Sequence, residues 1–358
     1  MYPHLTKHGF TESFAQEASM YANLFPARVC EQHRDLYKVI CEQGELAASV
    51  SGKLLFNTEQ KTDFPAVGDW VMIDRLDDKA GNAIIHHILK RKSAFTRKAS
   101  GTANEEQIVA ANIDTVFICM SLNENFNLRR IERYLTIAWD SKAKPVIVLT
   151  KSDLCDDLEQ KIIEISSVSM GADVATSSVK GEGAYSAIEK YIESGKTIAF
   201  IGSSGVGKST LINTLMGQEV LTVNEIREDD GRGRHTTTHR ELLMLPNGGI
   251  VIDTPGMREL HLYSGDITKA FEDIEELSEL CKYSDCSHTS EPGCKVQEAI
   301  ENGILSEKRF ENYVKLQREV EYEGLNSRQL ENAKINRMFG SKKEMKQTMK
   351  YFKDKNKR

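Results

Sequence analysis

From Leu36 to Leu89 the chain alternates short apolar runs with turn signals, a pattern that predicts short β-strands. The expected strands are Leu36–Cys41, Leu46–Val50, Leu54–Phe56, Trp70–Asp74 and Ile84–Leu89, and glycines mark the turns between them. Five strands of this length favour a small closed barrel, for which the OB-fold is the natural candidate. The fold alone does not establish what such a barrel binds.

Beyond residue 95 the pattern changes to apolar strands separated by amphipathic helices. Strands are expected at Thr115–Met120, Pro145–Leu149, Asp173–Thr176, Thr197–Ile201 and Ile250–Ile252. One helix is marked by Leu128, Ile131, Leu135 and Ala138, which recur every three to four residues. This alternation predicts a parallel α/β sheet covered on both faces. Strand signals end after Leu260, and the later residues are typical of helices.

These changes divide the chain into five segments. We expect an N-terminal arm over residues 1–34, an OB-fold domain over 35–95, an α/β domain over 96–262, a helical domain over 263–335 and a basic tail over 336–358. The arm is expected to be a short helical segment packed through aromatic residues such as Phe10 and Phe14. Residues 91–98 are expected to be a basic, polar connector.

Residues 202–209 read GSSGVGKS directly after the apolar run 197–201, which is the pattern of a phosphate-binding loop between a strand and a helix. Its glycines let backbone N–H groups approach the phosphates, and the following helix contributes the positive end of its dipole. Lys208 is expected to contact the β- and γ-phosphates, and Ser209 to place its hydroxyl on Mg²⁺. A chance glycine-rich turn is the alternative, but the complete pattern argues against it.

Two further segments fit the switches of a GTPase. An apolar strand ends in DTPG at 253–256, where Asp253 is expected to hold Mg²⁺ through water and Gly256 to direct a backbone N–H at the γ-phosphate. Between this segment and the phosphate-binding loop, residues 231–238 read GRGRHTTT, and we expect Thr237 to bind Mg²⁺. The adjacent threonines at 236 and 238 remain alternatives.

The sequence TKSD at 150–153 follows an apolar strand and is able to read guanine. The carboxylate of Asp153 accepts hydrogen bonds from both N1–H and N2–H₂ of guanine, which adenine does not offer, and the stem of Lys151 lies along the base plane. Ser177 and Ser178 follow another strand and are expected to support the base through backbone N–H groups. Ordinary strand ends are the alternative. These segments precede the phosphate-binding loop, so the motif order is rotated.

The residues that we assign to GTP from the sequence are Thr150, Lys151, Ser152, Asp153, Ser177, Ser178, Gly202, Ser203, Ser204, Gly205, Val206, Gly207, Lys208, Ser209, Thr210, Asp253 and Gly256. Mg²⁺ bound with GTP is assigned to Ser209, Thr237 and Asp253.

Cys281, Cys286, His288 and Cys294 offer three thiolates and one imidazole within a short segment. Four soft or borderline ligands from the protein suit a closed tetrahedral zinc site, which is structural rather than catalytic. Buried free cysteines are the alternative. The other cysteines are scattered, and an odd, uneven set of seven is not typical of a secreted disulfide framework.

With these motifs the sequence resembles the circularly permuted GTPases of the RsgA/YjeQ family, which act in late small-ribosomal-subunit assembly. The resemblance rests on the motif order, on GRHTTT at 233–238, on the zinc-ligand spacing and on GDWV at 68–71. It implies an OB-fold, a GTPase domain and a zinc domain in series, and slow GTP hydrolysis that the small subunit and its rRNA stimulate. The partners implied are GTP or GDP and the small subunit, and we expect a monomer.

Two departures from the usual GTPase pattern affect the expected chemistry. Thr150 stands where most GTPases have Asn, while Asp153 is kept. Met257 stands where many GTPases have a Gln that orients the attacking water, so intrinsic hydrolysis is expected to be slow. His235 is a candidate catalytic helper together with Thr237, and a hydrogen-bonding role in the switch loop is the alternative for His235.

Charge and hydropathy indicate where in the cell the protein is located and what else it contacts. The formal net charge is −6, yet the last 26 residues carry ten Lys or Arg and two Asp or Glu. This basic tail suggests contact with a polyanion, or else a solvated terminus. No run of apolar residues is long enough to span a membrane, and the start lacks the features of a signal peptide, so a cytoplasmic protein is expected.

Three functions remain open from the sequence. The first is a GTP hydrolase that binds the small ribosomal subunit during late assembly, with the GTP state controlling attachment. The second is a GTP-dependent metallochaperone that delivers zinc from the thiolate cluster, which requires a labile metal. The third is a nucleotide-sensing RNA-binding scaffold with negligible hydrolysis. Phosphate release with and without small subunits separates the first from the third.

Overall fold

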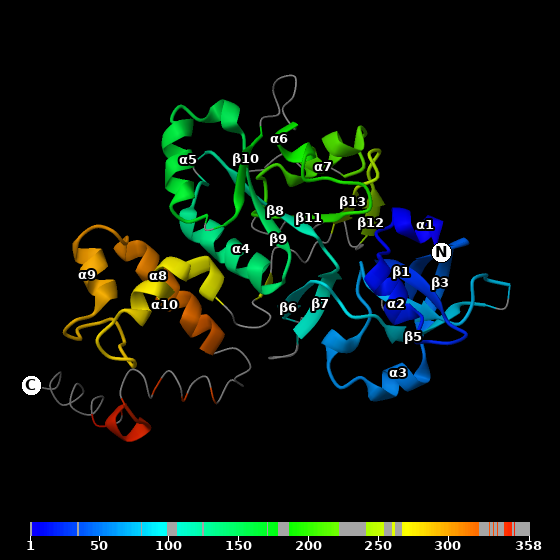
Figure 1. Ribbon diagram of the computed structural model, residues 1–358, viewed down its shortest axis with the longest axis horizontal. Helices are drawn as coiled ribbons and strands as arrows, with labels where there is room; N and C mark the ends of the chain where they lie inside the picture. The colour runs from blue at the N-terminus through cyan, green and yellow to red at the C-terminus, as the bar shows by residue number, and fades with distance from the viewer. Residues whose placement is uncertain are drawn as a thin grey trace, which may run out of the picture.

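The computed structural model describes residues 2–33, 36–79, 81–98, 106–123, 125–169, 171–177, 186–221, 241–253, 260–261, 267–321 and scattered positions between 329 and 347. Three parts are visible in Figure 1: a barrel near the N-terminus, a central α/β unit and a helical unit. In the described part of the chain, no helix is both long enough and apolar enough to cross a bilayer.

The barrel has the OB-fold strand arrangement. Its strands are β1 (Phe25–Gln32), β2 (Tyr37–Cys41), β3 (Gly44–Val50), β4 (Trp70–Ile73) and β5 (Ala83–Ile88). They pair in the order β1-β2-β3-β5-β4, and β4 pairs back onto β1 to close the barrel. Small and branched side chains such as Val29, Val39 and Ile85 fill the interior. The barrel expected from the sequence is confirmed, with two differences in its elements.

The first difference is that β1 lies within the range 1–34 that we expected to be a helical arm. Only its start is helical, as α1 (Pro3–Lys7) and α2 (Glu12–Ala18). The second is that Leu54–Phe56, expected as a strand, belongs to helix α3 (Gly52–Asn57). Ser51 Oγ accepts a hydrogen bond from Leu54 N at 3.1 Å and so caps this helix.

The central sheet is parallel except for its last strand, which also pairs antiparallel with β1 and so joins this sheet to the barrel. The parallel strands are β8 (Thr115–Ser121), β9 (Lys144–Thr150), β10 (Asp173–Thr176), β11 (Thr197–Ile201) and β13 (Ile250–Asp253), and β12 (Glu241–Met244) pairs antiparallel to β13. Their order is β10-β9-β8-β11-β13-β12. The order reverses direction between β8 and β11, and in open α/β sheets ligands bind at the carboxyl ends of the strands at such a point.

Helices cover both faces of this sheet, as the sequence predicted (Figure 1). Side chains of α4 (Leu128–Asp140) and α5 (Leu158–Ser166) join one core cluster, and those of α6 (Ser186–Glu189) and α7 (Lys208–Met216) join another on the opposite face. Alternate residues of β8 and β11 point into the two clusters.

A small second sheet lies between the barrel and the central sheet. It consists of β14 (Leu260–His261), β6 (Ala94–Lys98) and β7 (Glu106–Ala111) in that order. The prediction that residues 91–98 form a polar connector was therefore wrong for β6. Phe95 is fully buried in this strand. Burial of this one apolar side chain favours a strand even though its neighbours are polar.

The seam between the barrel and the central sheet contains a buried arginine. Arg28 of β1 donates from Nη2 to Thr197 Oγ1 at 2.7 Å and from Nη1 to the His8 carbonyl at 2.5 Å. Burial lowers the pKa of its guanidinium to about 10, while Asp114 and Asp69 act in the opposite direction. Hydrogen bonding of this buried cation therefore joins the barrel, the N-terminal helices and strand β11.

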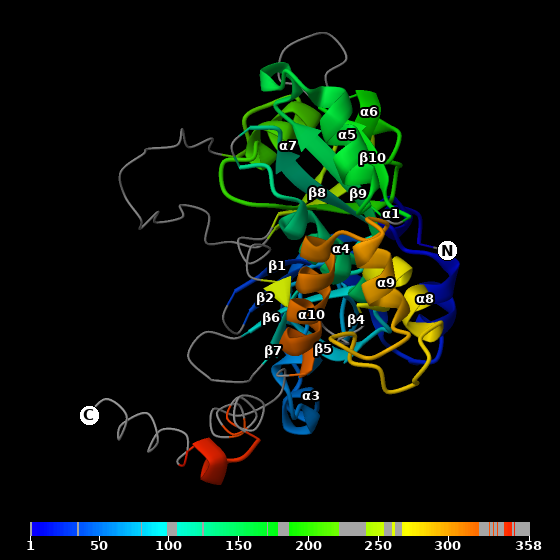
Figure 2. The ribbon, with the colours of Figure 1, turned by 90° about the vertical axis from the view of Figure 1, so that its left-hand side faces the viewer.

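The helical unit packs on α4 through a second buried charge. It comprises η4 (Thr268–Phe271), α8 (Glu272–Glu279), α9 (Lys295–Glu301) and α10 (Glu307–Glu321), and Figure 2 shows it beside α4. Glu132 of α4 is fully buried and accepts hydrogen bonds from Arg309 at 2.7 Å and Asn312 at 2.7 Å. Arg309 also forms an ion pair with Asp273, which completes the contact between α4, α8 and α10.

Gly68 gives a test of the seam. Its φ is +92°, and a Cβ there would lie 2.1 Å from the Ala111 carbonyl oxygen and 2.8 Å from Ile252 Cδ1. Gly68→Ala is expected to cost at least about 3 kcal/mol, because steric overlap adds to left-handed strain. Gly81 has a similar φ of +97° with nothing within 4 Å, so Gly81→Ala should cost only about 1 kcal/mol. Urea unfolding measures both, and equal losses would contradict the close seam.

Candidate nucleotide site and metal centre

The loop between β11 and α7 has the backbone that a phosphate-binding loop requires. Gly202, Gly205 and Gly207 all have positive φ, at 145°, 73° and 98°. A Cβ at Gly202 would lie 2.5 Å from the carbonyl oxygen of Cys119, so only glycine fits between β11 and β8. The glycines therefore serve both the turn itself and its close packing on the sheet.

Positive charge gathers at the start of α7. Lys208 is the first residue of this helix, and its Nζ donates to the carbonyls of Gly202 and Ser203 at 2.7 Å each. Ser209 and Thr210 follow in the first turn, where the backbone N–H groups are free of intrahelical partners. Burial raises the pKa of Cys119 beneath the loop to about 12, with Lys208 acting in the opposite direction. The cation and helix end together suit a polyphosphate.

The TKSD segment lies against this loop, and its contact joins residues that are 56 positions apart in sequence. Thr150 ends β9, and its buried Oγ1 donates to the carbonyl of Val206 at 2.6 Å. Lys151 has φ +58°, which turns the chain into the 3₁₀ turn η2 (Ser152–Leu154) that contains Asp153. The hydroxyl of Thr150 thus ties the expected base-reading segment to the phosphate-binding loop.

The segment after β10 joins the same edge of the sheet. The Ser177 carbonyl accepts from Ser152 N at 3.4 Å and from Ser152 Oγ at 3.3 Å, and Ser177 N donates to the carbonyl of Leu149. Asp253 ends β13, which pairs in parallel with β11, so its carboxylate belongs to the same edge. Ser178, His235, Thr237 and Gly256 lie outside the described residues.

Sequence reasoning did not identify Asn213 of α7, which organises the chain after the helix. Its Oδ1 accepts from Leu221 N at 2.7 Å and Val220 N at 3.1 Å, and its Nδ2 donates to the carbonyl of Leu221 at 2.7 Å. The side chain is buried, so these hydrogen bonds satisfy its amide. The available signal was a polar residue on the apolar face of a short helix.

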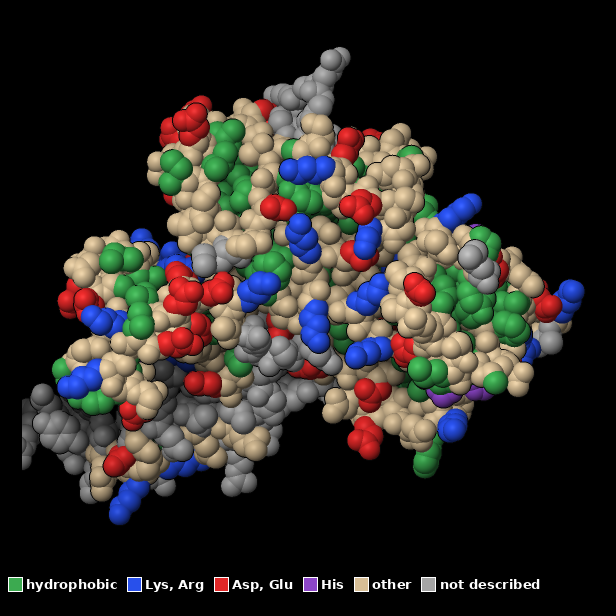
Figure 3. Space-filling view, in the orientation of Figure 1, with side chains coloured by type: hydrophobic (Ala, Val, Ile, Leu, Met, Phe, Trp, Pro, Cys, Tyr) green, Lys and Arg blue, Asp and Glu red, His purple; other side chains and the backbone are tan. Residues whose placement is uncertain are grey.

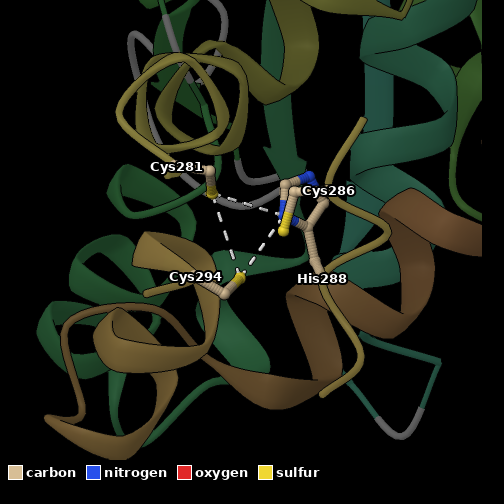
Figure 4. Close-up of side chains that lie close together, drawn as sticks. All are labelled: Cys281, Cys286, His288 and Cys294. Atoms are coloured by element: carbon tan, nitrogen blue, oxygen red, sulfur yellow. Dashed lines mark hydrogen bonds between the residues drawn. The ribbon is translucent and has the colours of Figure 1, made fainter. Parts of the chain in front are cut away.

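Cys281, Cys286, His288 and Cys294 converge in the helical unit, and Figure 4 shows their side chains pointing toward one another. Their ligand atoms all lie within 4.8 Å of one another. His288 Nδ1 is 3.6 Å from Cys281 Sγ and 3.4 Å from Cys294 Sγ. Three sulfurs and one ring nitrogen at this separation fit one tetrahedral zinc ion.

Neighbouring groups orient these four ligands. Ser278 Oγ lies 3.1 Å from His288 Nε2, which leaves Nδ1 facing the sulfurs. The backbone N–H groups of Lys295 and Gln297 donate to the sulfurs of Cys281 and Cys294 at 3.3 and 3.4 Å. N–H donors to sulfur favour the thiolate form that binds metal, so the surroundings suit a held ion.

Comparison with known proteins gives a consistent result. The family model for the RsgA GTPase matches residues 88–263. "Small ribosomal subunit biogenesis GTPase RsgA 2" of Lactiplantibacillus plantarum is 51% identical over 344 residues, covering 96% of each chain. "Small ribosomal subunit biogenesis GTPase RsgA 1" of Listeria innocua is 45% identical over 89% of this chain and 90% of its own.

Solved structures agree with this result. The crystal structure of YjeQ from Thermotoga maritima matches with a TM-score of 0.62 and 28% identity, covering 85% of this chain and 100% of that one. The structure of YloQ, described as a circularly permuted GTPase, matches with a TM-score of 0.60 and 25% identity, covering 85% and 98%. The expected multidomain fold, with its rotated motif order, is therefore confirmed.

The metal centre predicts the behaviour of three variants. Cys294→Ser should abolish the binding of one zinc per chain, because it removes a ligand. Ser278→Ala should weaken zinc affinity about 10- to 100-fold, because His288 loses its orienting partner. Cys155→Ser, outside the cluster, is the matched control and should bind zinc normally. Elemental analysis and competition with a chelator measure these changes, and unaltered zinc in Cys294→Ser would contradict the site.

Proposed function

The chain belongs to the RsgA GTPase family, and we therefore propose that it hydrolyses GTP and acts in the assembly of the small ribosomal subunit, as the names of its relatives state. One observation carries the nucleotide part of this proposal. Lys208 of the phosphate-binding loop and the TKSD segment meet at the same edge of the sheet, joined by the hydrogen bond from Thr150 to Val206.

We assign the triphosphate to the loop at 202–207 and the start of α7. Lys208 contacts the β- and γ-phosphates, and the backbone N–H groups of the loop hold the remaining oxygens. Ser209, Asp253 and Thr237 offer hydroxyl and carboxylate oxygens, which suit Mg²⁺. When bound with GTP, Mg²⁺ neutralises charge that develops on the transferred phosphoryl group.

Guanine selectivity is assigned to Asp153, which accepts from N1–H and N2–H₂ of the base. Lys151 covers the base plane, and the backbone at Ser177 and Ser178 supports the exocyclic oxygen. Thr150 replaces the asparagine of most GTPases, and its hydroxyl supplies the hydrogen bond that holds the base-reading and phosphate-binding segments at a fixed separation. A fixed separation favours guanosine triphosphate over a base or a polyphosphate alone.

Hydrolysis by the isolated chain is expected to be slow because Met257 cannot orient water. His235 and Thr237 are the candidate groups for orienting the attacking water, and the small subunit with its rRNA completes the arrangement. The GTP state would control attachment: the GTP form holds the subunit, and loss of the γ-phosphate releases it. The chain then acts as a monomer in the cytoplasm, where small subunits mature.

Zinc in this proposal is structural. The four ligands leave no open position, and backbone N–H groups and Ser278 hold the donor atoms in place. A metallochaperone needs an exchangeable site, so this arrangement does not favour delivery of zinc. The ion would stabilise the turn between α8 and α9, which buries few apolar side chains of its own.

Phosphate release from GTP tests the proposed function directly. The chain alone should turn over slowly, and purified small subunits should raise the rate by at least about tenfold; partner proteins that complete a GTPase site raise its rate by about 10³- to 10⁵-fold. Large subunits and free RNA are the matched comparisons and should stimulate less. An equal rate with and without small subunits would favour the scaffold function instead.

The base-reading assignment predicts a change of nucleotide preference. In Asp153→Asn, the amide no longer accepts two hydrogen bonds from guanine but donates one to the 2-carbonyl of xanthine. GTP affinity should fall about 100-fold or more, while XTP affinity rises, because unpaired polar groups oppose the wrong base. Competition binding with GTP, XTP and ATP measures this exchange. Unchanged preference for GTP would show that Asp153 does not read the base.

A further inference from the structure

A group of lysines lies on the edge of the central sheet opposite the nucleotide site. Lys144 begins β9, Lys196 directly precedes β11, and Lys142 is the second residue after α4. Lys92 lies in the segment between β5 and β6. We call these four residues the amino-edge patch, because they surround the amino ends of β8, β9 and β11.

Backbone contacts hold this patch in one area. The Asp114 carbonyl, just before β8, accepts from Lys144 N at 2.9 Å, and Asp114 Oδ1 is 3.3 Å from Lys196 Nζ. The Ser141 carbonyl, next to Lys142, accepts from Ala94 N at 3.1 Å, which brings the segment of Lys92 alongside. Neighbouring strands are about 4.8 Å apart, so the lysines span a distance comparable to a few nucleotides.

The patch is exposed and carries excess positive charge. All four lysines are exposed, and the carboxylates paired with them are Asp114 for Lys196 and Asp173 for Lys144. In the part of the chain that the structure describes, no ion pair is made by Lys92 or Lys142. Figure 3 shows Lys and Arg side chains gathered at the centre of this face, where the three units meet.

Lys92 has an aromatic ring and charged groups of both signs around it. Its Nζ lies 4.6 Å from the ring centre of Phe14, an aromatic rather than an acidic partner. Burial lowers its pKa, and although Asp114 raises it, Lys196 and Arg28 lower it further. The carboxylate of Asp114 is thus the strongest charged neighbour of this ammonium, and the cations Lys196 and Arg28 act against it.

Lys142 has a left-handed backbone conformation that favours glycine. The hydrogen bonds from Lys142 N to the Trp139 carbonyl and from Ala143 N to the Ala138 carbonyl form a Schellman motif at the end of α4. Lys142 takes the left-handed position of this motif with φ +67°, where glycine is strongly preferred. A cation is therefore kept at a site where its side chain opposes the local conformation.

We propose that the amino-edge patch is a contact surface for the phosphate backbone of ribosomal RNA in the small subunit. It lies on the edge of the sheet opposite the nucleotide site. This inference rests on the proposed function, which supplies the small subunit as partner. The spacing and exposure of the lysines suit phosphate groups, which are bound without base recognition. Lys269, 3.9 Å from the ring centre of Trp139 on α4, extends the cationic surface toward the helical unit.

A simpler role explains only part of the patch. A lysine at the carboxyl end of a helix interacts favourably with the helix dipole, and this accounts for a cation at Lys142. It does not account for Lys92 or Lys196, since neither follows a helix of more than one turn. Binding to small subunits separates the two roles, because a lysine that serves only the helix dipole can be replaced without weakening that binding.

The test uses the full chain and purified small subunits. Two variants are tested. One is Lys142→Gly alone, and the other combines Lys92→Gln, Lys142→Gly and Lys196→Gln. The matched control is Lys161→Gln on α5. Binding is measured with a non-hydrolysable GTP analogue at several salt concentrations, beside urea unfolding and GTPase rates without subunits. The strands are five to seven residues long, so the patch is about 20 Å from the nucleotide edge and the basal rate should not change.

We expect the triple variant to bind at least about tenfold more weakly and to reduce the slope of log affinity against log salt by about 2, because each lost phosphate contact removes about 0.7–0.9. Lys142→Gly should unfold at equal or higher urea and still bind more weakly. If the triple variant binds small subunits with the wild-type affinity and salt slope, the proposed role of the patch is wrong and the proposed function is unaffected. If the wild-type chain neither binds nor responds to small subunits, the proposed function fails with it.

Discussion

The guanidinium of Arg28 lies where the barrel, the N-terminal helices and the central sheet meet, and the relative placement of all three depends on its hydrogen bonds. Its partner in the sheet, Thr197, begins the strand that runs directly into the phosphate-binding loop. Gly68 packs so closely against Ala111 and Ile252 at the same seam that no other residue fits. The barrel is thus joined to the nucleotide-binding strand by a rigid contact rather than by a tether.

The helical unit is joined to the α/β unit by a different means. Here the contact is a buried carboxylate, Glu132, held between arginine and amide donors from two helices. Such a cluster is costly when one partner is removed and is satisfied in only one geometry, so it specifies how the helices dock. The cluster of Cys281, Cys286, His288 and Cys294 belongs to the same unit, where the ring of His288 packs edge-on against Phe310, the residue that follows Arg309.

Much of this architecture follows from local sequence patterns. The strands β10 and β11 have the predicted bounds, and the four-ligand cluster converges as its spacing implied. The missed elements have physical reasons. Strand β1 was hidden because a charged residue, Arg28, is fully buried in it, and helix α3 was misread because Leu55 and Phe56 are exposed rather than alternating. The hydrogen bonds from Thr150 to Val206 and from Arg309 to Glu132 join residues distant in sequence, which no local pattern reports.

The two-residue strand β14 carries a mechanical consequence. It pairs with β6, and in the sequence it lies between Asp253 at the nucleotide edge and the helices of the helical unit. A pairing this short breaks and re-forms readily, whereas the seams on either side of it are fixed by buried charge. The pairing of β14 with β6 can therefore be lost at little cost while the buried-charge contacts of the barrel and of the helical unit persist.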